Sequence, residues 1–217
     1  MTPTYLKKTP LFIFWGIVIL LSVHFYIENA VAYFFGYRNP RFGETFFHNQ
    51  FWFGLHIAAA TCSLFLGPIQ FWEKIRNKYL RFHRIAGKIY IIGSLIAAVA
   101  AFRLALVYDC MGCRYSLIPL SFLFFLTTAL AWYAIKQRNI TAHKQFMVRS
   151  YTCALAFVFA RLYQVIPIDF IFNPIVNDNE LGVVMEWTTS ILPLIVVEIF
   201  MIWLPSLNKH SVVSQRS

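Results

Sequence analysis

The chain has 217 residues, of which 59% are hydrophobic, 18% aromatic and only 13% charged, and its mean hydropathy is +0.61. Soluble domains are about 45–50% apolar and about 25% charged, so this composition excludes an ordinary soluble domain. The formal net charge of +10 does not indicate a nucleic-acid partner, because the basic residues stand in short segments between apolar runs. We expect an all-α integral membrane protein surrounded by a lipid bilayer.

Six apolar stretches are long enough to cross the membrane as helices, which takes about 20 residues. In chain order, the predicted helices are Leu11–Phe35, Phe51–Trp72, Ile85–Tyr108, Leu117–Ile135, Arg149–Phe170 and Thr188–Leu204. The first stretch is too long for a removable signal peptide and lacks a small-residue cleavage site. No linker interrupts the series, which predicts one domain over residues 1–217, a six-transmembrane-helix bundle.

The distribution of the 19 Lys and Arg residues predicts the orientation. Most of them lie in the N-terminal segment, the second and fourth connecting segments and the tail. The other connecting segments hold only Arg38, Arg41 and Arg114. Cytoplasmic loops keep the basic excess, so we expect both termini in the cytoplasm and a multi-pass protein of the cell (inner) membrane.

Arg103, Arg161 and Glu198 lie away from the ends of the predicted helices, and Glu28 lies in the outer third of the first helix. An unpaired charge near the bilayer centre costs roughly 2.5–3.5 kcal/mol on insertion scales, so these groups must pair, face water or snorkel. One interpretation is an Arg161–Glu198 ion pair that sets the helix register. The other is a polar, outward-opening pocket for a small molecule, lined by these four residues and Gln164.

Four of the six histidines fall at two depths. His24 and His56 lie in the outer half of the first two helices, and His83 and His143 lie at the cytoplasmic starts of the third and fifth. Facing histidines are what axial ligation of a b-type haem requires. We expect His83 and His143 to bind the iron of an inner haem, and His56, with His24, to bind at the outer level. For each histidine alone, a hydrogen bond across helices is the competing interpretation.

Neighbouring residues fit a haem in part. Gly87 follows His83 by one turn and would let a flat ring approach the backbone, while Arg84 and Arg149 lie at the level of haem propionates. A zinc site is less expected, because no tight cluster of His, Cys and carboxylate residues is visible.

Cys110 and Cys113 form a C-x-x-C motif in the second outward segment, where an oxidising environment is expected. The pair is either a redox-active dithiol or a small structural disulfide. A dithiol enzyme that passes electrons to quinone would need a second outer cysteine pair. The other two cysteines, Cys62 and Cys153, lie inside predicted helices, which favours a structural or incidental role.

Three runs, HIAAATCSLFLGPIQF, RFHRIAGKIY and TAHKQFMVRSYTCALAFVFARLY, carry a resemblance that covers roughly residues 51–163. In them the chain resembles the bacterial multi-pass membrane family catalogued as domain of unknown function 2306. The matching positions are His56, Gly67, Pro68, Gln70, Phe71, His83, Arg84, Gly87, Tyr90, His143, Arg149 and Arg161. The resemblance implies a multi-pass membrane fold and no particular activity. It also implies that His24 is not a motif position, and that the cysteine pair departs from a loop that is usually glycine-rich.

The leading prediction is a membrane electron-transfer protein of b-type cytochrome character, with histidine-ligated haem b and quinone as a candidate redox partner. The first alternative is a non-redox protein that binds or transports a small molecule or lipid at the Arg161/Glu198 pocket. The second is an intramembrane metal-dependent hydrolase, in which the same histidines would hold zinc and activate water.

Overall fold

The computed structural model describes residues 9–36, 44, 48–160 and 178–207, and all regular structure in these ranges is helical. Five helical stretches in them are long and apolar enough to cross a membrane. These are Ile13–Phe34, Gln50–Phe71, Leu80–Val107, Met111–Lys136 and Glu180–Leu207. The all-α prediction is confirmed.

The fifth predicted helix, Arg149–Phe170, is described only in part. Helix α8 runs over Ile140–Ala160, and residues 161–177 lie outside the described part of the chain. The described portion of this helix carries Lys144 and Arg149 and is not among the five apolar stretches. A membrane crossing by this helix, which would bring the number of crossings to six, therefore stays a prediction.

Several helices begin earlier than the hydropathy pattern predicts. The predicted starts Ile85, Leu117, Arg149 and Thr188 were wrong by more than a turn. The observed starts are Leu80 in α6 (Leu80–Val107), Met111 in α7 (Met111–Lys136), Ile140 in α8 and Asp178 in α11 (Asp178–Glu198). Hydropathy marks the part of a helix that suits hydrocarbon, whereas the backbone ladder continues through polar residues into the interface.

The polar segment predicted between the second and third helices is also mostly helical. Helix α4 (Gln50–Phe71) is followed by the short helix α5 (Glu73–Lys78), and α6 begins two residues after α5 ends. His83 consequently lies within the first turns of α6.

The chain divides into two compact units, residues 1–109 and 110–217, which are described separately. That they form one bundle stays a prediction. The first unit contains α1 (Thr9–Phe25), the π-helical turn η1 (Tyr26–Val31), the short α2 (Ala32–Phe34), α4, α5 and α6.

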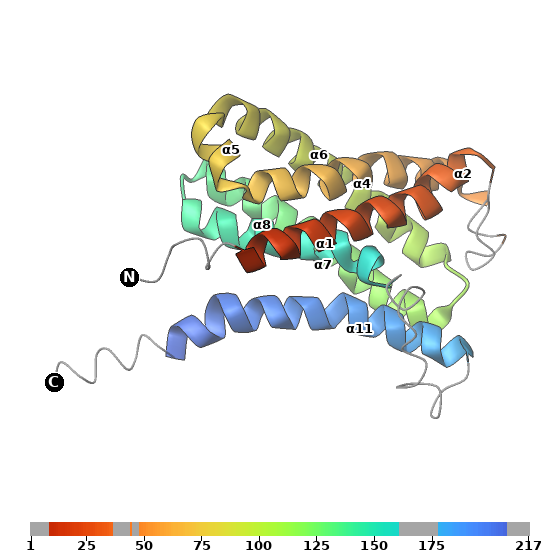
Figure 1. Ribbon diagram of the computed structural model, residues 1–217. Helices are drawn as coiled ribbons and strands as arrows, with labels where there is room; N and C mark the ends of the chain where they lie inside the picture. The colour runs from red at the N-terminus through yellow and green to blue at the C-terminus, as the bar shows by residue number, and fades with distance from the viewer. Residues whose placement is uncertain (1–8, 37–43, 45–47, 161–177, 208–217) are drawn as a thin grey trace. The chain divides into compact units, whose positions relative to one another are not determined.

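Helices α4 and α6 pack side by side in the first unit (Figure 1). Small residues allow this close approach: a Cβ added to Gly93 of α6 would lie 2.8 Å from Cys62 Cβ and 3.0 Å from the Ala59 carbonyl oxygen of α4. The Ser63 and Ser94 hydroxyls join the two helices by a buried 2.7 Å hydrogen bond.

The opposite face of α6 carries large exposed side chains. Ile85, Ile89, Ile92, Ile96 and Val99 recur every three or four residues and are all exposed. Such a stripe is unfavourable in water and natural against acyl chains, so we assign it to contact with the lipid bilayer.

The second unit contains α7, α8, α11 and the π-helical η3 (Ile199–Trp203). Helices α7 and α8 pack against each other, and α11 packs on both. The hydroxyls of Thr128 on α7 and Ser150 on α8 share a buried 2.7 Å hydrogen bond. Each unit thus joins its main helix pair by one buried hydroxyl–hydroxyl contact.

Candidate functional site

His143 lies in the first turn of α8, where its ring is held by the neighbouring helix. The Asn139 side-chain oxygen accepts a 3.0 Å hydrogen bond from the Ala142 N–H and caps this helix start. His143 Nδ1 lies 2.9 Å from the carbonyl oxygen of Ala131 on α7. A carbonyl only accepts, so Nδ1 carries the proton, and the neutral ring keeps its lone pair on Nε2. Metal-ligating histidines use this arrangement.

His56 has the same geometry in the first unit. It lies in α4, and its Nδ1 is 2.9 Å from the carbonyl oxygen of Ala97 on α6. The proton is again placed on Nδ1, which makes Nε2 the nitrogen with ligand character. Both rings are partly buried.

His83 differs, because the buried Gln70 of α4 contacts it. In the orientation that satisfies both ends of the Gln70 amide, its NH₂ group donates to His83 Nδ1 at 3.0 Å and to the His83 carbonyl at 3.3 Å. The amide oxygen accepts from the Gly87 N–H at 3.2 Å. In this arrangement Nδ1 is an acceptor, so neutral His83 carries its proton on Nε2. Iron ligation by His83 Nε2 requires the amide to turn over, so that its oxygen accepts from Nδ1–H.

The space beside Gly87 is filled by the same glutamine. A Cβ added to Gly87 would lie 3.1 Å from Gln70 Oε1. The structure therefore gives Gly87 a role in admitting the Gln70 side chain, rather than a haem ring, against α6. The sequence indicated Gln70 only as a motif position. Its amide stands alone near the end of an apolar run, and this pattern could have indicated that the side chain has a polar partner.

The remaining predicted site residues are spread over the chain. His24 is exposed on α1, and Glu28 is exposed one turn later in η1, while Arg103 on α6 is partly exposed. Arg84 is exposed in the second turn of α6. Arg161 and Gln164 lie outside the described residues, so the pocket predicted around Arg161 stays a prediction.

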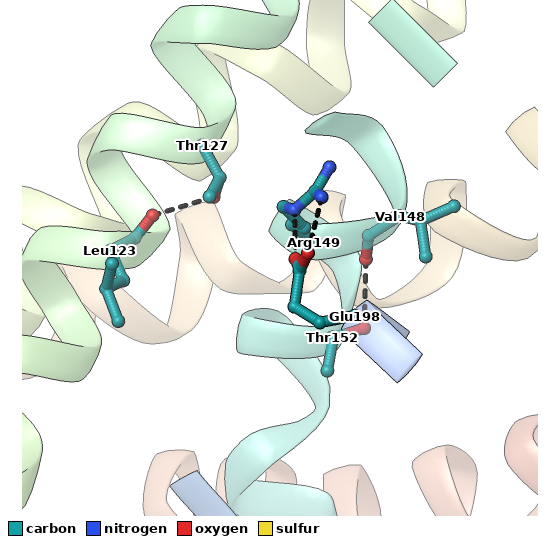
Figure 2. A network of polar contacts seen from close by, with 6 residues as sticks. All are labelled: Leu123, Thr127, Val148, Arg149, Thr152 and Glu198. Atoms are coloured by element: carbon teal, nitrogen blue, oxygen red, sulfur yellow. Dashed lines mark hydrogen bonds and ion pairs between the residues drawn. The ribbon is translucent and has the colours of Figure 1, made fainter. Parts of the chain in front are cut away.

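Arg149 of α8 pairs with Glu198, the last residue of α11 (Figure 2). Arg149 Nη2 donates to Glu198 Oε2 at 2.8 Å, and Arg149 Nε donates to Oε1. This is the bidentate fork that makes arginine–carboxylate pairs strong. The side chains are 15% and 34% exposed, respectively.

Sequence reasoning missed this pair, since it placed Arg149 beside haem propionates and Glu198 opposite Arg161. The cause is the early start of α8. With the helix beginning at Ile140, Arg149 lies about 13 Å along the axis, at 1.5 Å per residue, instead of at the helix start. In the described residues, the guanidinium fork of Arg149 is engaged by Glu198 and is not directed to an outside anion.

The threonines drawn with the pair in Figure 2 bond within their own helices. Thr127 Oγ1 donates to the Leu123 carbonyl at 2.7 Å, and Thr152 Oγ1 donates to the Val148 carbonyl at 2.9 Å. Their hydroxyl protons are used there, so the donors to the Glu198 carboxylate in this network come from Arg149.

Cys110 and Cys113 are joined by a disulfide at the start of α7. Cys62 on α4 and Cys153 on α8 are free thiols. In the described residues, no three His, Cys, Asp or Glu side chains lie close enough together to hold a metal ion.

Comparison with known protein families gives a match. A family model described as "Predicted membrane protein (DUF2306)" matches residues 53–201. The matched range includes three of the candidate ligands, the Arg149–Glu198 pair and the cysteine bridge. No curated protein and no solved structure matches the chain. Together with the five apolar helices, the match establishes a multi-pass membrane protein.

Proposed function

From the premise that the chain belongs to the DUF2306 family of predicted membrane proteins, we propose that it is a membrane electron-transfer protein of b-type cytochrome character. It binds haem b through histidine imidazoles and exchanges electrons with quinone. Haem supplies a one-electron couple whose potential is set by its axial ligands and their hydrogen bonds.

The hydrogen bonds of His143 and His56 are the observation that carries this proposal. Each ring donates Nδ1–H to a backbone carbonyl of the neighbouring helix, 2.9 Å away. The bond fixes the tautomer and the ring orientation and raises the basicity of Nε2, as second-shell bonds do at ligating histidines.

Each haem also needs a second axial histidine beside His143 or His56. As predicted from the sequence, His83 would be the second ligand of the inner haem, which requires the Gln70 amide to turn its oxygen toward Nδ1. His24 accompanies His56 at the outer level. Because Arg149 is engaged by Glu198, Arg84 is the cation that would face an inner propionate.

The topology belongs to the same proposal. Six helices cross the inner membrane, both termini lie in the cytoplasm, and α8 with its continuation is the fifth crossing. His83 and His143 then lie near the cytoplasmic face and His56 nearer the outer face, which would let electrons move between the two sides.

The spectrum of the purified protein tests the proposal. Protein extracted in mild detergent from haem-sufficient cells should show the sharp reduced α-band of a six-coordinate b-type haem. His143→Ala and His56→Ala should each remove one component of that band. His48→Ala is the matched control: His48 is exposed and its Nδ1 bonds the Glu44 carbonyl four residues earlier, so the spectrum should not change.

A preparation that is colourless and stays so after haem reconstitution, although it is monodisperse, would overturn the cytochrome proposal. The pocket alternative around Arg161 and Glu198 would then take its place. Loss of bound small molecules or lipids in Glu198→Gln, detected by mass spectrometry of the extracted protein, would support that alternative.

A further inference from the structure

The Cys110–Cys113 bridge occupies the N-terminus of a long helix. Cys110 is the N-cap residue of the 26-residue α7, and its Sγ accepts a 3.2 Å hydrogen bond from the backbone N–H of Cys113. Amide donors and the positive end of the helix dipole stabilise a thiolate at this position. A thiolate released from Cys110 would therefore meet a donor that is already in place.

The two sulfur-bearing residues differ in accessibility. Cys110 is partly exposed, whereas Cys113 is 4% exposed. Attack by an outside thiol is therefore directed to Cys110, and Cys113 is shielded. A bridge that only braced the chain would not require this difference between its two ends.

The residues between the cysteines are held by α11. The Trp187 indole Nε1–H donates to the Gly112 carbonyl at 3.2 Å. A Cβ added to Gly112 would lie 2.8 Å from Val183 Cγ2, so the backbone of the motif rests directly on that helix. Opening the bridge would thus leave the two cysteines close together, ready to close again.

We propose that Cys110 and Cys113 form a thiol–disulfide exchange site whose substrate is a protein dithiol. Cys110 is the sulfur that is attacked, and Cys113 is the leaving and resolving cysteine. The chemistry involves the second unit alone and does not depend on haem. Only the side on which it occurs rests on the proposed topology, which places the start of α7 outside.

The exchange balances without another reactant. A substrate thiolate attacks Cys110 Sγ, the Cys110–Cys113 bond breaks, and Cys113 leaves as a thiolate. The second substrate thiolate then attacks the substrate sulfur of the mixed disulfide, which forms the substrate disulfide and releases Cys110. Two electrons pass from the substrate to the bridge, and the two substrate protons end on the two cysteines.

The test uses the full chain with Cys62→Ala and Cys153→Ala, so that the motif holds the only cysteines. The oxidised protein is mixed with a reduced, unfolded protein that contains two cysteines, and thiols are counted by alkylation and mass spectrometry. We expect one disulfide to form in the added protein for each bridge opened.

Single variants then identify the reactive sulfur. Cys113→Ser, incubated with the disulfide form of the same added protein, should form a mixed disulfide at least about ten times faster than Cys110→Ser, because reactivity follows thiolate character and access. Equal rates would overturn the assignment of Cys110. The protein with both motif cysteines provides a test that does not depend on whether the serine variants fold. If its bridge opens with dithiothreitol in denaturant but does not oxidise the reduced protein, the proposal of an exchange site is wrong.

Discussion

Arg149 and Glu198 are 49 residues apart in the chain and meet in a bidentate ion pair between α8 and the end of α11. Each would be costly to keep charged in a membrane alone. Glu198 also marks the change from α11 to the π-helical η3, and π-helical turns are frequent at functional sites. The pair is a bidentate, charge-assisted link between these two helices.

Breaking the pair should destabilise the second unit. Arg149→Gln and Glu198→Gln each leave one partner without its charge-assisted bonds, and each should cost roughly 2 kcal/mol. The double variant should cost less than the sum by about 1 kcal/mol or more. Unfolding of the detergent-solubilised protein measures these free energies.

The first unit offers a control for this cycle. Arg76 and Glu73 are 3.3 Å apart with side chains 28% and 80% exposed, and an exposed pair contributes at most about 1 kcal/mol. A cycle on Arg76 and Glu73 should show little coupling. Strictly additive losses at Arg149 and Glu198 would show that these two residues do not meet.

The closeness of α4 and α6 predicts a sharp difference between two glycines. Gly93→Ala brings a methyl group within 3.0 Å of Cys62 Cβ and should lower stability by about 1–3 kcal/mol. Gly54→Ala, on α4, meets nothing within 4 Å and should be neutral or stabilising by up to about 1 kcal/mol. Thermal unfolding in detergent compares the two, and equal effects would contradict the helix contact.

Gln70 should control the inner haem through His83. In Gln70→Glu the carboxylate can only accept, so Nδ1 of His83 carries the proton and Nε2 becomes a stronger ligand. We expect the inner haem to be retained and its midpoint potential to fall, measured by redox titration of the α-band.

Gln137→Glu is the control for added negative charge, because Gln137 is exposed after the end of α7. It should leave the midpoint potential unchanged. If Gln70→Glu also leaves it unchanged while the haem is bound, His83 is not a ligand.

The topology is tested by reporter fusions. Fusions after Asp109 and after Asn179 should report the outside, and fusions after Arg138 and at Ser217 the cytoplasm, because basic segments are retained inside. A cytoplasmic signal after Asp109 or Asn179 would rule out the six-crossing arrangement.

The sequence by itself determined the class of protein. The free energy of transferring a stretch from water into the membrane depends mainly on which residues it contains. The apolar stretches therefore predicted a multi-pass helical membrane protein before any contact was known. The same stretches located His56, His83 and His143 near helix ends, and the runs around them indicated the family that residues 53–201 match.

Only the tertiary structure decided which polar atoms meet. The tautomer of His143 depends on a carbonyl of another helix, and the tautomer of His83 depends on the orientation of the Gln70 amide. The partner of Glu198 depended on where α8 begins. Hydropathy does not report this start, because polar residues can form the first turns of a helix with the same backbone hydrogen bonds as apolar ones. Hydrogen bonds are directional and act over about 3 Å, so their partners follow from packing and not from composition.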